Sequence, residues 1–199
     1  MLTDKNLRDF TKEIASKTSV PGGGGASSLV SSIAISLGDM VGEFTVGKEK
    51  YKDVESDILM LMEKAQNLRL KFIDLIEEDA KAFEPLSKAY SIPRDDPKRD
   101  EIMEECLKRA LSVPLEIFDR TLDAIDILKE FNEKGSKIIK SDAVTGSVVA
   151  LGALKGAAVN VKVNTRLLKD KEYATKVEKH IDLKINEYSE IVENIFKGF

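Results

Sequence analysis

The stretch PGGGGASSLVSSIAISLGDMVGEFTV, residues 21–46, starts with four consecutive glycines after a proline and continues as a run of small and aliphatic residues. Glycine loses more backbone entropy on ordering than other residues, so this run is either a flexible linker or a loop where bare backbone approaches something closely. The apolar run over 26–46 predicts a buried helix, which favours the loop. The first amide groups of a helix are unpaired donors that attract anions or polar ligand atoms.

The glycine run fits neither of two familiar phosphate-binding motifs. A Walker loop would end in Gly-Lys-Ser/Thr, whereas these glycines are followed by Ala26-Ser27. A Rossmann fingerprint would need a third glycine at Ser27 and a strand upstream, but the apolar residues of 2–17 follow helical spacing. The run by itself leaves a ligand contact and a purely structural tight turn equally open.

Helical periodicity continues through the rest of the chain, and no segment alternates cleanly enough to be a half-buried strand. We therefore predict an all-α fold, a single-domain helical bundle spanning residues 1–199. Its six helices are expected at about 2–18, 26–46, 51–90, 97–133, 142–168 and 171–197. Asp96-Pro97, Ser141 and Asp170 are expected to start the last three of these helices, and Gly135 is expected to end the fourth.

Composition narrows the class of protein. A length of 199 residues suits one domain, and a net charge of −4 argues against a nucleic-acid or anionic-membrane partner. A single cysteine, Cys106, permits no intrachain disulfide and indicates a reducing compartment, and the first residues lack the apolar core of a signal peptide. We expect a cytoplasmic protein without membrane spans. One histidine, His180, and one distant cysteine exclude a zinc cluster, so no metal site is predicted.

The third predicted helix carries an acid where an apolar residue is expected. Its apolar residues alternate at steps of four and three, as in a coiled-coil seam: Val54, Ile58, Leu61, Ala65, Leu68, Phe72 and Leu75. The next seam position is Asp79, and an acid on a buried stripe is costly unless it is paired or lines a wet cleft. Asp79 therefore either bonds a neighbouring helix at the kink before Pro85 or belongs to a functional cleft.

The fifth predicted helix is built of small residues. Gly152, Gly156, Asn160 and Asn164 follow one another at steps of four, so they share one face on which the glycines let another helix approach. The two asparagines should be buried and need partners, which are neighbouring helices, a ligand, or both. Asp142, in the first turn, is either a capping charge or a functional acid.

A lysine cluster follows the glycine-rich helix. Lys48, Lys50 and Lys52 stand after Gly47, where they are either a solvated helix end or the cationic rim of a site for an acidic ligand.

These features occur together, in order, over nearly the whole chain. They are Pro-Gly-Gly-Gly with its small-residue helix, Gly47-Lys48-Glu49-Lys50-Tyr51, Asp79-Ala80-Lys81-Ala82-Phe83, Arg99, Ser112-Val113-Pro114-Leu115, Ser141-Asp142, Gly156-Ala157, Asn160-Val161, Asn164, Arg166 and Asp170. The ordered set resembles the cyclodeaminase domain of the formiminotransferase-cyclodeaminase family, which also includes bacterial methenyltetrahydrofolate cyclohydrolases. The resemblance implies a helical fold of its own class and a homodimer.

The resemblance also implies chemistry on a folate. In the cyclodeaminase reaction, nitrogen 10 of 5-formiminotetrahydrofolate attacks the formimino carbon, ammonia leaves, and the 5,10-methenyl bridge forms. Two alternatives remain: a methenyltetrahydrofolate cyclohydrolase, which opens that bridge with water, and a non-catalytic folate-binding helical dimer. The implied partners are a folate and a second copy of the chain, with no nucleic acid, no membrane and no cofactor beyond the tetrahydrofolate substrate.

The matching positions supply the expected site residues. Asp142 and Asp79 are expected to be the catalytic carboxylates, one acid and one base in an order the sequence leaves open. The residues expected to bind substrate are Gly22, Gly23, Gly24, Gly25, Lys48, Ser141, Asn160 and Asn164. Lys48, with Arg99 or Arg166, is expected to hold the glutamate tail, and the asparagines to bond the pterin or order the site. We expect one pocket to join the glycines, both acids and Asn160.

Overall fold

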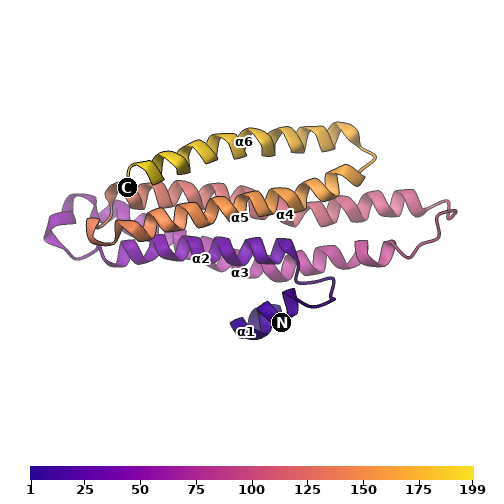
Figure 1. Cartoon of the computed structure of the whole chain (residues 1–199), viewed down its shortest axis with the longest axis horizontal. Coiled ribbons are helices and arrows are strands. Elements are labelled where there is room, and N and C mark those ends of the chain that lie inside the picture. The colour runs from indigo at the N-terminus through magenta and orange to yellow at the C-terminus, as the bar shows by residue number, and fades with distance from the viewer.

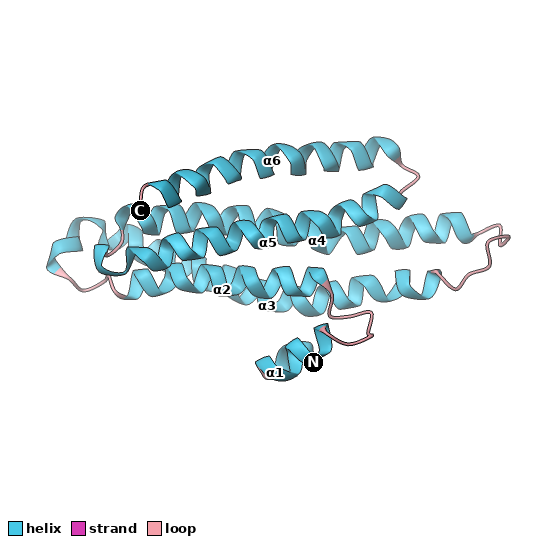
Figure 2. Ribbon diagram, viewed as in Figure 1, coloured by secondary structure: helices cyan, strands magenta, loops and turns pink.

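The computed structural model describes residues 1–199 and contains only helices, which confirms the predicted all-α fold (Figures 1 and 2). The α-helices are α1 (Leu7–Ile14), α2 (Gly23–Glu43), α3 (Glu55–Ala89), α4 (Arg99–Lys134), α5 (Lys140–Leu167) and α6 (Lys171–Lys197). Three short 3-10 helices complete the chain: η1 (Leu2–Asp4), η2 (Glu49–Val54) and η3 (Lys137–Ile139).

Helices α2 to α5 form an up-and-down four-helix bundle in which each helix packs against its neighbours in sequence and α5 returns to α2. Helix α6 lies outside the bundle along α5 and α4, and α1 lies on the opposite side, below α2 and α3 in Figure 1. One hydrophobic core fills the bundle, with Phe72, Phe118 and Phe131 fully buried at its centre. Each helix contributes its apolar stripe to this core, as the sequence pattern requires.

The seam of α3 is confirmed. Six of its seven predicted members, from Ile58 to Leu75, are buried, and Val54 packs against the core at the start of the helix. The stripe resumes after Asp79 with buried Ala82 and Leu86, and the helix continues through Pro85 without a break. Asp79 is therefore the one acid on an otherwise apolar stripe.

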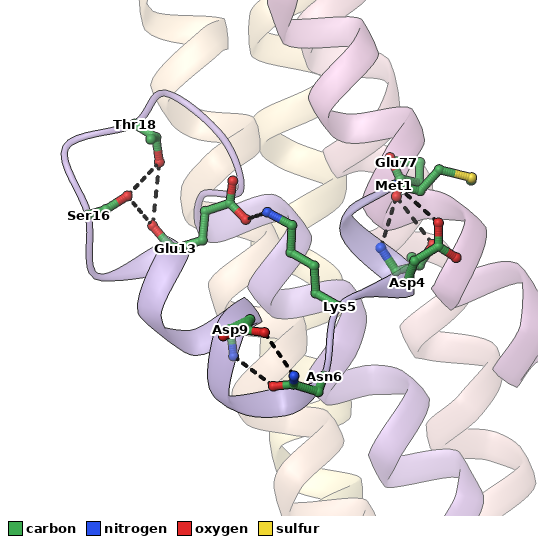
Figure 3. Close-up of polar contacts among 10 residues, drawn as sticks. Met1, Asp4, Lys5, Asn6, Asp9, Glu13, Ser16, Thr18 and Glu77 are labelled. Atoms are coloured by element: carbon green, nitrogen blue, oxygen red, sulfur yellow. Dashed lines mark hydrogen bonds and ion pairs between the residues drawn. The ribbon is translucent and has the colours of Figure 1, made fainter.

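The predicted helix over 2–18 is wrong, because two short pieces occupy this range: η1 and α1 (Figure 3). Lys5 ends the first piece, and Asn6 caps the second, since its side-chain oxygen accepts a hydrogen bond of 3.0 Å from the N–H of Asp9. The segment is tied to α3, because the N–H and hydroxyl of Thr3 both donate to Glu77, at 2.9 and 3.2 Å. An ion pair between Lys5 and Glu13 closes it on itself.

Three predicted helix starts are corrected. Helix α2 begins at Gly23 rather than Ala26, so three of the four glycines form its first turn. Ser141 does not cap α5, because η3 leads directly into that helix and Ile139 stands at its N-cap. The carboxylate of Asp96 accepts from the N–H of Lys98 in a turn, and α4 begins only at Arg99.

Two other predicted boundaries are confirmed. Asp170 caps α6 by accepting a 3.0 Å hydrogen bond from the N–H of Tyr173, and Gly135 ends α4.

Small residues let α5 and α2 approach closely. A Cβ atom added to Gly146 would lie 2.8 Å from the carbonyl oxygen of Ala34, and one added to Gly156 would lie 2.6 Å from the hydroxyl of Ser27. Gly152 was expected to let another helix approach, but it is exposed and a Cβ there would meet nothing within 4 Å. The close face of α5 is thus set by Gly146 and Gly156.

Helix α2 is the shortest member of the bundle, with 21 residues against 35 in α3, 36 in α4 and 28 in α5. Its first turn meets α3 at Asp79 and α5 at Asn160, before either of those helices has ended. The three longer helices therefore extend past the start of α2. This mismatch leaves space under the N-terminus of α2.

Two helices, Gly23–Glu43 and Lys137–Leu167, are long and apolar enough to cross a membrane by length and composition alone. In the bundle, 56% and 50% of these windows are buried against other helices, and core helices of soluble proteins pass the same test.

Candidate active site

A cavity of about 240 Å³ occupies the space under the first turn of α2. Its lining comes from the connection before α2 and from α3, α4 and α5, with Tyr90 at the end of α3: Ser19, Val20, Gly22, Gly23, Gly24, Asp79, Phe83, Tyr90, Ala110, Pro114, Asn160, Val163 and Asn164. Five of the predicted substrate-binding residues and one predicted catalytic acid therefore meet in one place.

The first turn of α2 needs glycine because polar side chains press against its backbone. A Cβ atom on Gly24 would lie 2.4 Å from both carboxylate oxygens of Asp79, and one on Gly23 would lie 2.7 Å from the amide nitrogen of Asn160. Gly25 is less crowded, since its Cβ would make ordinary contacts of 3.5 and 3.6 Å. The predicted close backbone approach is therefore present at Gly23 and Gly24, and the neighbour is the protein's own acid and amide.

Asp79 interacts with this helix start as a capping group supplied from α3. The first intrahelical hydrogen bond of α2 runs from Ala26 to Gly22, so the preceding N–H groups have no helical acceptor. One of them, the N–H of Gly25, donates to the Asp79 carboxylate. Asp79 both bonds a neighbouring helix and lines the cavity, so the two interpretations from the sequence describe one arrangement.

The environment of Asp79 raises the pKa of its carboxyl towards neutral pH. Burial disfavours the charged form and raises the pKa of this carboxyl to about 6, and the hydrogen bond from Gly25 offsets only part of that effect. A carboxyl group with a pKa near 6 populates both protonation states at physiological pH. It is therefore suited to transfer protons to or from a bound ligand.

Asn160 and Asn164 line the cavity from α5 without cross-linking helices. The amide nitrogen of Asn160 donates 2.8 Å to the carbonyl of Gly156, and that of Asn164 donates 3.0 Å to the carbonyl of Asn160. Both amides are thus held by their own helix, and neither side-chain oxygen accepts a hydrogen bond from the protein. Two residues that line the cavity therefore each keep a side-chain oxygen free to accept a hydrogen bond from a ligand N–H group.

An apolar wall completes the cavity, and none of its residues was among those expected to bind substrate. Phe83, Pro114 and Val163 lie around Asp79 and the asparagines, with Tyr90 exposed beside them. The signal was available, because Phe83 stands one helical turn after Asp79 and Val163 stands three residues after Asn160. A flat aromatic ligand would find both an apolar surface and hydrogen-bonding groups here.

Asp142, Ser141 and Lys48 lie at the other end of the bundle. Asp142 is half-buried in the first turn of α5, and the 18 residues that separate it from Asn160 correspond to about 27 Å along the helix. Lys48 is exposed beyond the end of α2, with its ammonium 5.8 Å from the ring centre of Phe44. Within one chain the expected single pocket is therefore not formed, and these three residues form a separate group.

The protein has a second, larger cavity outside the candidate site. A larger cavity of about 560 Å³ lies between α3 and α4, lined mainly by charged side chains such as Lys71, Arg120 and Asp123, and it contains none of them. No group of three or more histidine, cysteine or acidic side chains is placed to hold a metal ion.

Comparison with known proteins identifies the family. The profile of the family described as Formiminotransferase-cyclodeaminase matches residues 6–183. The chain therefore belongs to the formiminotransferase-cyclodeaminase family, a family of enzymes, and the resemblance drawn from the motifs is confirmed.

The relatives carry the names of two activities, cyclohydrolase and cyclodeaminase. A methenyltetrahydrofolate cyclohydrolase of Methylorubrum extorquens is 32% identical over 99% of this chain and 97% of its own length. The formimidoyltransferase-cyclodeaminase of Sus scrofa is 26% identical, and the chain spans only 35% of that protein. Among solved structures, a formiminotetrahydrofolate cyclodeaminase from Thermotoga maritima is 27% identical, with a TM-score of 0.88 over 100% of this chain and 98% of the other.

We expect Gly24→Ala to disrupt the site. The new methyl group would overlap the Asp79 carboxylate, so the variant should lose about 1–3 kcal/mol of unfolding free energy as side chain and backbone shift apart. Gly25→Ala is the matched control, because its methyl group meets only ordinary contacts, and it should stay within about 1 kcal/mol of wild type. Chemical denaturation measures both, and equal losses would contradict the proposed crowding at Gly24.

The raised pKa of Asp79 makes stability depend on pH. Because the folded-state pKa of about 6 lies above the unfolded value of 3.8, the stabilising protonated form is lost as pH rises through 6. Asp79→Asn imitates the protonated form, so its stability relative to wild type should increase between pH 4 and pH 8, by at most about 3 kcal/mol. Unfolding free energies at several pH values measure this difference. A difference that does not change with pH would show that burial does not raise the pKa of Asp79.

Proposed function

We propose that this protein is a formiminotetrahydrofolate cyclodeaminase, closing 5-formiminotetrahydrofolate to 5,10-methenyltetrahydrofolate with release of ammonia. The observation that carries the proposal is Asp79, a half-buried carboxyl with a pKa of about 6, in a cavity that also offers two asparagine amides and an apolar wall. The Thermotoga maritima relative, titled a cyclodeaminase and similar over the whole chain, supports it.

The proposed reaction takes place at one carbon, and it needs proton transfer between the nitrogens bound to that carbon. Nitrogen 10 attacks the formimino carbon, a C–N bond forms, and the nitrogen-10 proton passes to the formimino nitrogen to give a tetrahedral adduct. The bond to that nitrogen then breaks, and one further proton is required for it to leave as ammonia. Protonated Asp79 supplies this proton, and the resulting carboxylate faces the positive charge that develops on the methenyl bridge. The step uses no metal or redox cofactor.

The folate would lie with its pterin against the apolar wall. Phe83 and Pro114 offer a surface for the flat ring, and the side-chain oxygens of Asn160 and Asn164 accept from its N–H groups. Gly23 and Gly24 contribute by shape, since their bare backbone leaves room for the acid and the amide beside the ligand.

A second candidate function is methenyltetrahydrofolate cyclohydrolase. The observation that favours it is the Methylorubrum extorquens relative, which is 32% identical and has the same extent as this chain, with no additional transferase region. In that reaction water adds to the methenyl carbon while the Asp79 carboxylate takes one of its protons. The bond from that carbon to one nitrogen then breaks, the hydroxyl proton is lost to solvent as the formyl C=O forms, and protonated Asp79 returns its proton to the leaving nitrogen.

We further propose that the enzyme is a homodimer of the cytoplasm. The lone Cys106 and the absence of any possible intrachain disulfide are in keeping with a reducing compartment.

Supplying the two folates separately tests the activity. With 5-formiminotetrahydrofolate, the proposed cyclodeaminase should produce the methenyl chromophore together with equimolar ammonia. Rapid loss of supplied methenyltetrahydrofolate, with no turnover of the formimino compound, would instead identify the cyclohydrolase. Saturable folate binding without turnover of either compound would overturn both activities.

The two predicted carboxylates can be tested with isosteric amides. Asp79→Asn should lower kcat by about 10²–10⁴-fold, because a positioned proton donor is removed, and Asp142→Asn should lower it at least about tenfold. Both should keep wild-type helical content by circular dichroism. Asp74→Asn is the control, since Asp74 is exposed on α3 away from the cavity and should retain wild-type turnover. Wild-type rates in either variant would remove that residue from the catalytic set.

A further inference from the structure

The cavity at Asp79 is too small for a whole folate. Its volume of about 240 Å³ lies below the roughly 300–1,000 Å³ of pockets that enclose drug-sized ligands. A folate has two halves, a pterin and an aminobenzoyl ring that carries a glutamate, and the reacting carbon lies between nitrogen 5 of the first and nitrogen 10 of the second. With that carbon at Asp79, the two halves leave the acid in different directions, so part of the substrate must extend beyond this cavity.

A second cavity, of about 310 Å³, adjoins the first one. Tyr90, at the end of α3, lines both. On α4, Leu107 of the second cavity stands one turn before Ala110 of the first, and on α5 the two linings follow each other in the same way. There, Leu167 of the second cavity stands one turn after Asn164 of the first. Figure 1 shows this end of the bundle, where α3, α4 and α5 extend past the start of α2. The two cavities therefore meet at Tyr90.

The second cavity offers an apolar lining that suits a ring. The side chains of Tyr90 and Leu167 are 49% and 51% exposed, so both present apolar surface to solvent. Half-buried Met103 and buried Leu107 complete this lining from α4. Aromatic rings pack favourably against one another and against aliphatic side chains. An aminobenzoyl ring would find such partners here.

Three of the four charged side chains in the second cavity already have partners in the protein. Both carboxylate oxygens of Glu104 accept backbone hydrogen bonds, from the N–H of Lys169 at 2.7 Å and from that of Asp170 at 3.1 Å. The ammonium of Lys169 forms an ion pair with Asp100. The acids of this lining are therefore occupied.

Arg99 is the fourth charged residue, and it forms no ion pair. It is half-buried, and its Nε donates a hydrogen bond of 3.0 Å to the carbonyl of Ile92 in the connection between α3 and α4. This bond holds the guanidinium in place and leaves its two terminal nitrogens for a ligand. Two N–H groups side by side match the two oxygens of a carboxylate.

Resting on the proposed function, we propose that the second cavity binds the aminobenzoyl-glutamate half of the substrate, with its ring against Tyr90 and Leu167 and its glutamate on Arg99. The sequence left three basic residues open for the glutamate. Lys48 lies at the opposite end of the bundle, and Arg166 is exposed and lines neither cavity. Tyr90 is a positioning residue in this arrangement, because it holds the half of the substrate that carries nitrogen 10 and so places that nitrogen at the reacting carbon.

A binding cycle tests the contact between Arg99 and the glutamate. The probes are 5-formyltetrahydrofolate, in which an oxygen replaces the formimino nitrogen, and 5-formyltetrahydropteroate, which lacks the glutamate. Loss of the glutamate should weaken binding to the wild type by about 10–100-fold, and Arg99→Met should weaken binding of the folate by the same factor. The variant should then bind both probes equally.

Arg94→Met is the matched control, because Arg94 is an exposed arginine of the same connection and should leave both affinities unchanged. Calorimetric titration measures all the affinities. Equal losses with both probes in Arg99→Met would show that Arg99 acts only on the structure, and that result would overturn the proposed contact.

The role of Tyr90 is tested with a probe that lacks the ring. Tyr90→Ala should weaken binding of 5-formyltetrahydrofolate by about five- to twentyfold, and Tyr90→Phe should restore it, because the ring makes the contact. Binding of 6-methyltetrahydropterin, which has no aminobenzoyl ring, should be the same in Tyr90→Ala and the wild type. Tyr173→Ala, on a tyrosine of α6 that is 37% exposed and lines neither cavity, is the control. An equal loss with the pterin would contradict the assignment of Tyr90.

These measurements need no turnover, so they separate this proposal from the proposed function. Turnover of the formimino compound together with folate binding that depends on neither Arg99 nor Tyr90 would overturn the second cavity alone. The expected binding cycle together with hydrolysis of only the methenyl compound would overturn the cyclodeaminase and support the second cavity. No binding of 5-formyltetrahydrofolate to the wild type would overturn both.

Discussion

The carboxylate of Asp79 packs directly against the first turn of α2. The contact is so close that only glycine fits at Gly24. The carboxylate lies so near Gly24 that a single methyl group would overlap it, and it accepts the N–H of Gly25. A helix start needs partners for its free N–H groups, and here the partner comes from a neighbouring helix rather than from its own cap. This contact fixes where α2 begins along α3.

The point at which α2 begins determines its register against α5 and the position of the cavity. Once α2 begins beside Asp79, its register against α5 places Ser27 on Gly156 and Ala34 on Gly146, where small residues allow close packing. The same starting point leaves α2 shorter than its neighbours, and the space beyond it becomes the cavity. The glycine run therefore shapes the site in two ways: it leaves room for the Asp79 carboxylate, and it begins α2 at the point that leaves the cavity open.

Much of this was accessible from the sequence. Periodicity predicted the helical bundle and the α3 seam, and the interruption of that seam at Asp79 marked this residue as a candidate functional acid because burying a lone carboxylate is costly. The start of α2 was not accessible, because the signal that fixes it is a tertiary contact with α3 and glycine has low intrinsic helix propensity. The pattern also placed Asp142 and Asn160 on one helix, and the 18 residues between them correspond to about 27 Å. The predicted helix therefore already conflicted with the expectation of a single pocket, and the structure confirms the helix.

The position of Asp79 couples occupancy of the cavity to protonation. Asp79 is only partly buried, so solvent offsets part of the cost of charging this carboxyl, whose pKa burial already raises to about 6. A flat ligand that displaces this water and brings no positive charge would raise that pKa further, so its binding would take up a proton from solution. A cationic ligand would reverse the effect and release one. If the proposed function holds, a neutral pterin and its methenyl cation would therefore bind with opposite proton exchange, before any bond is made or broken.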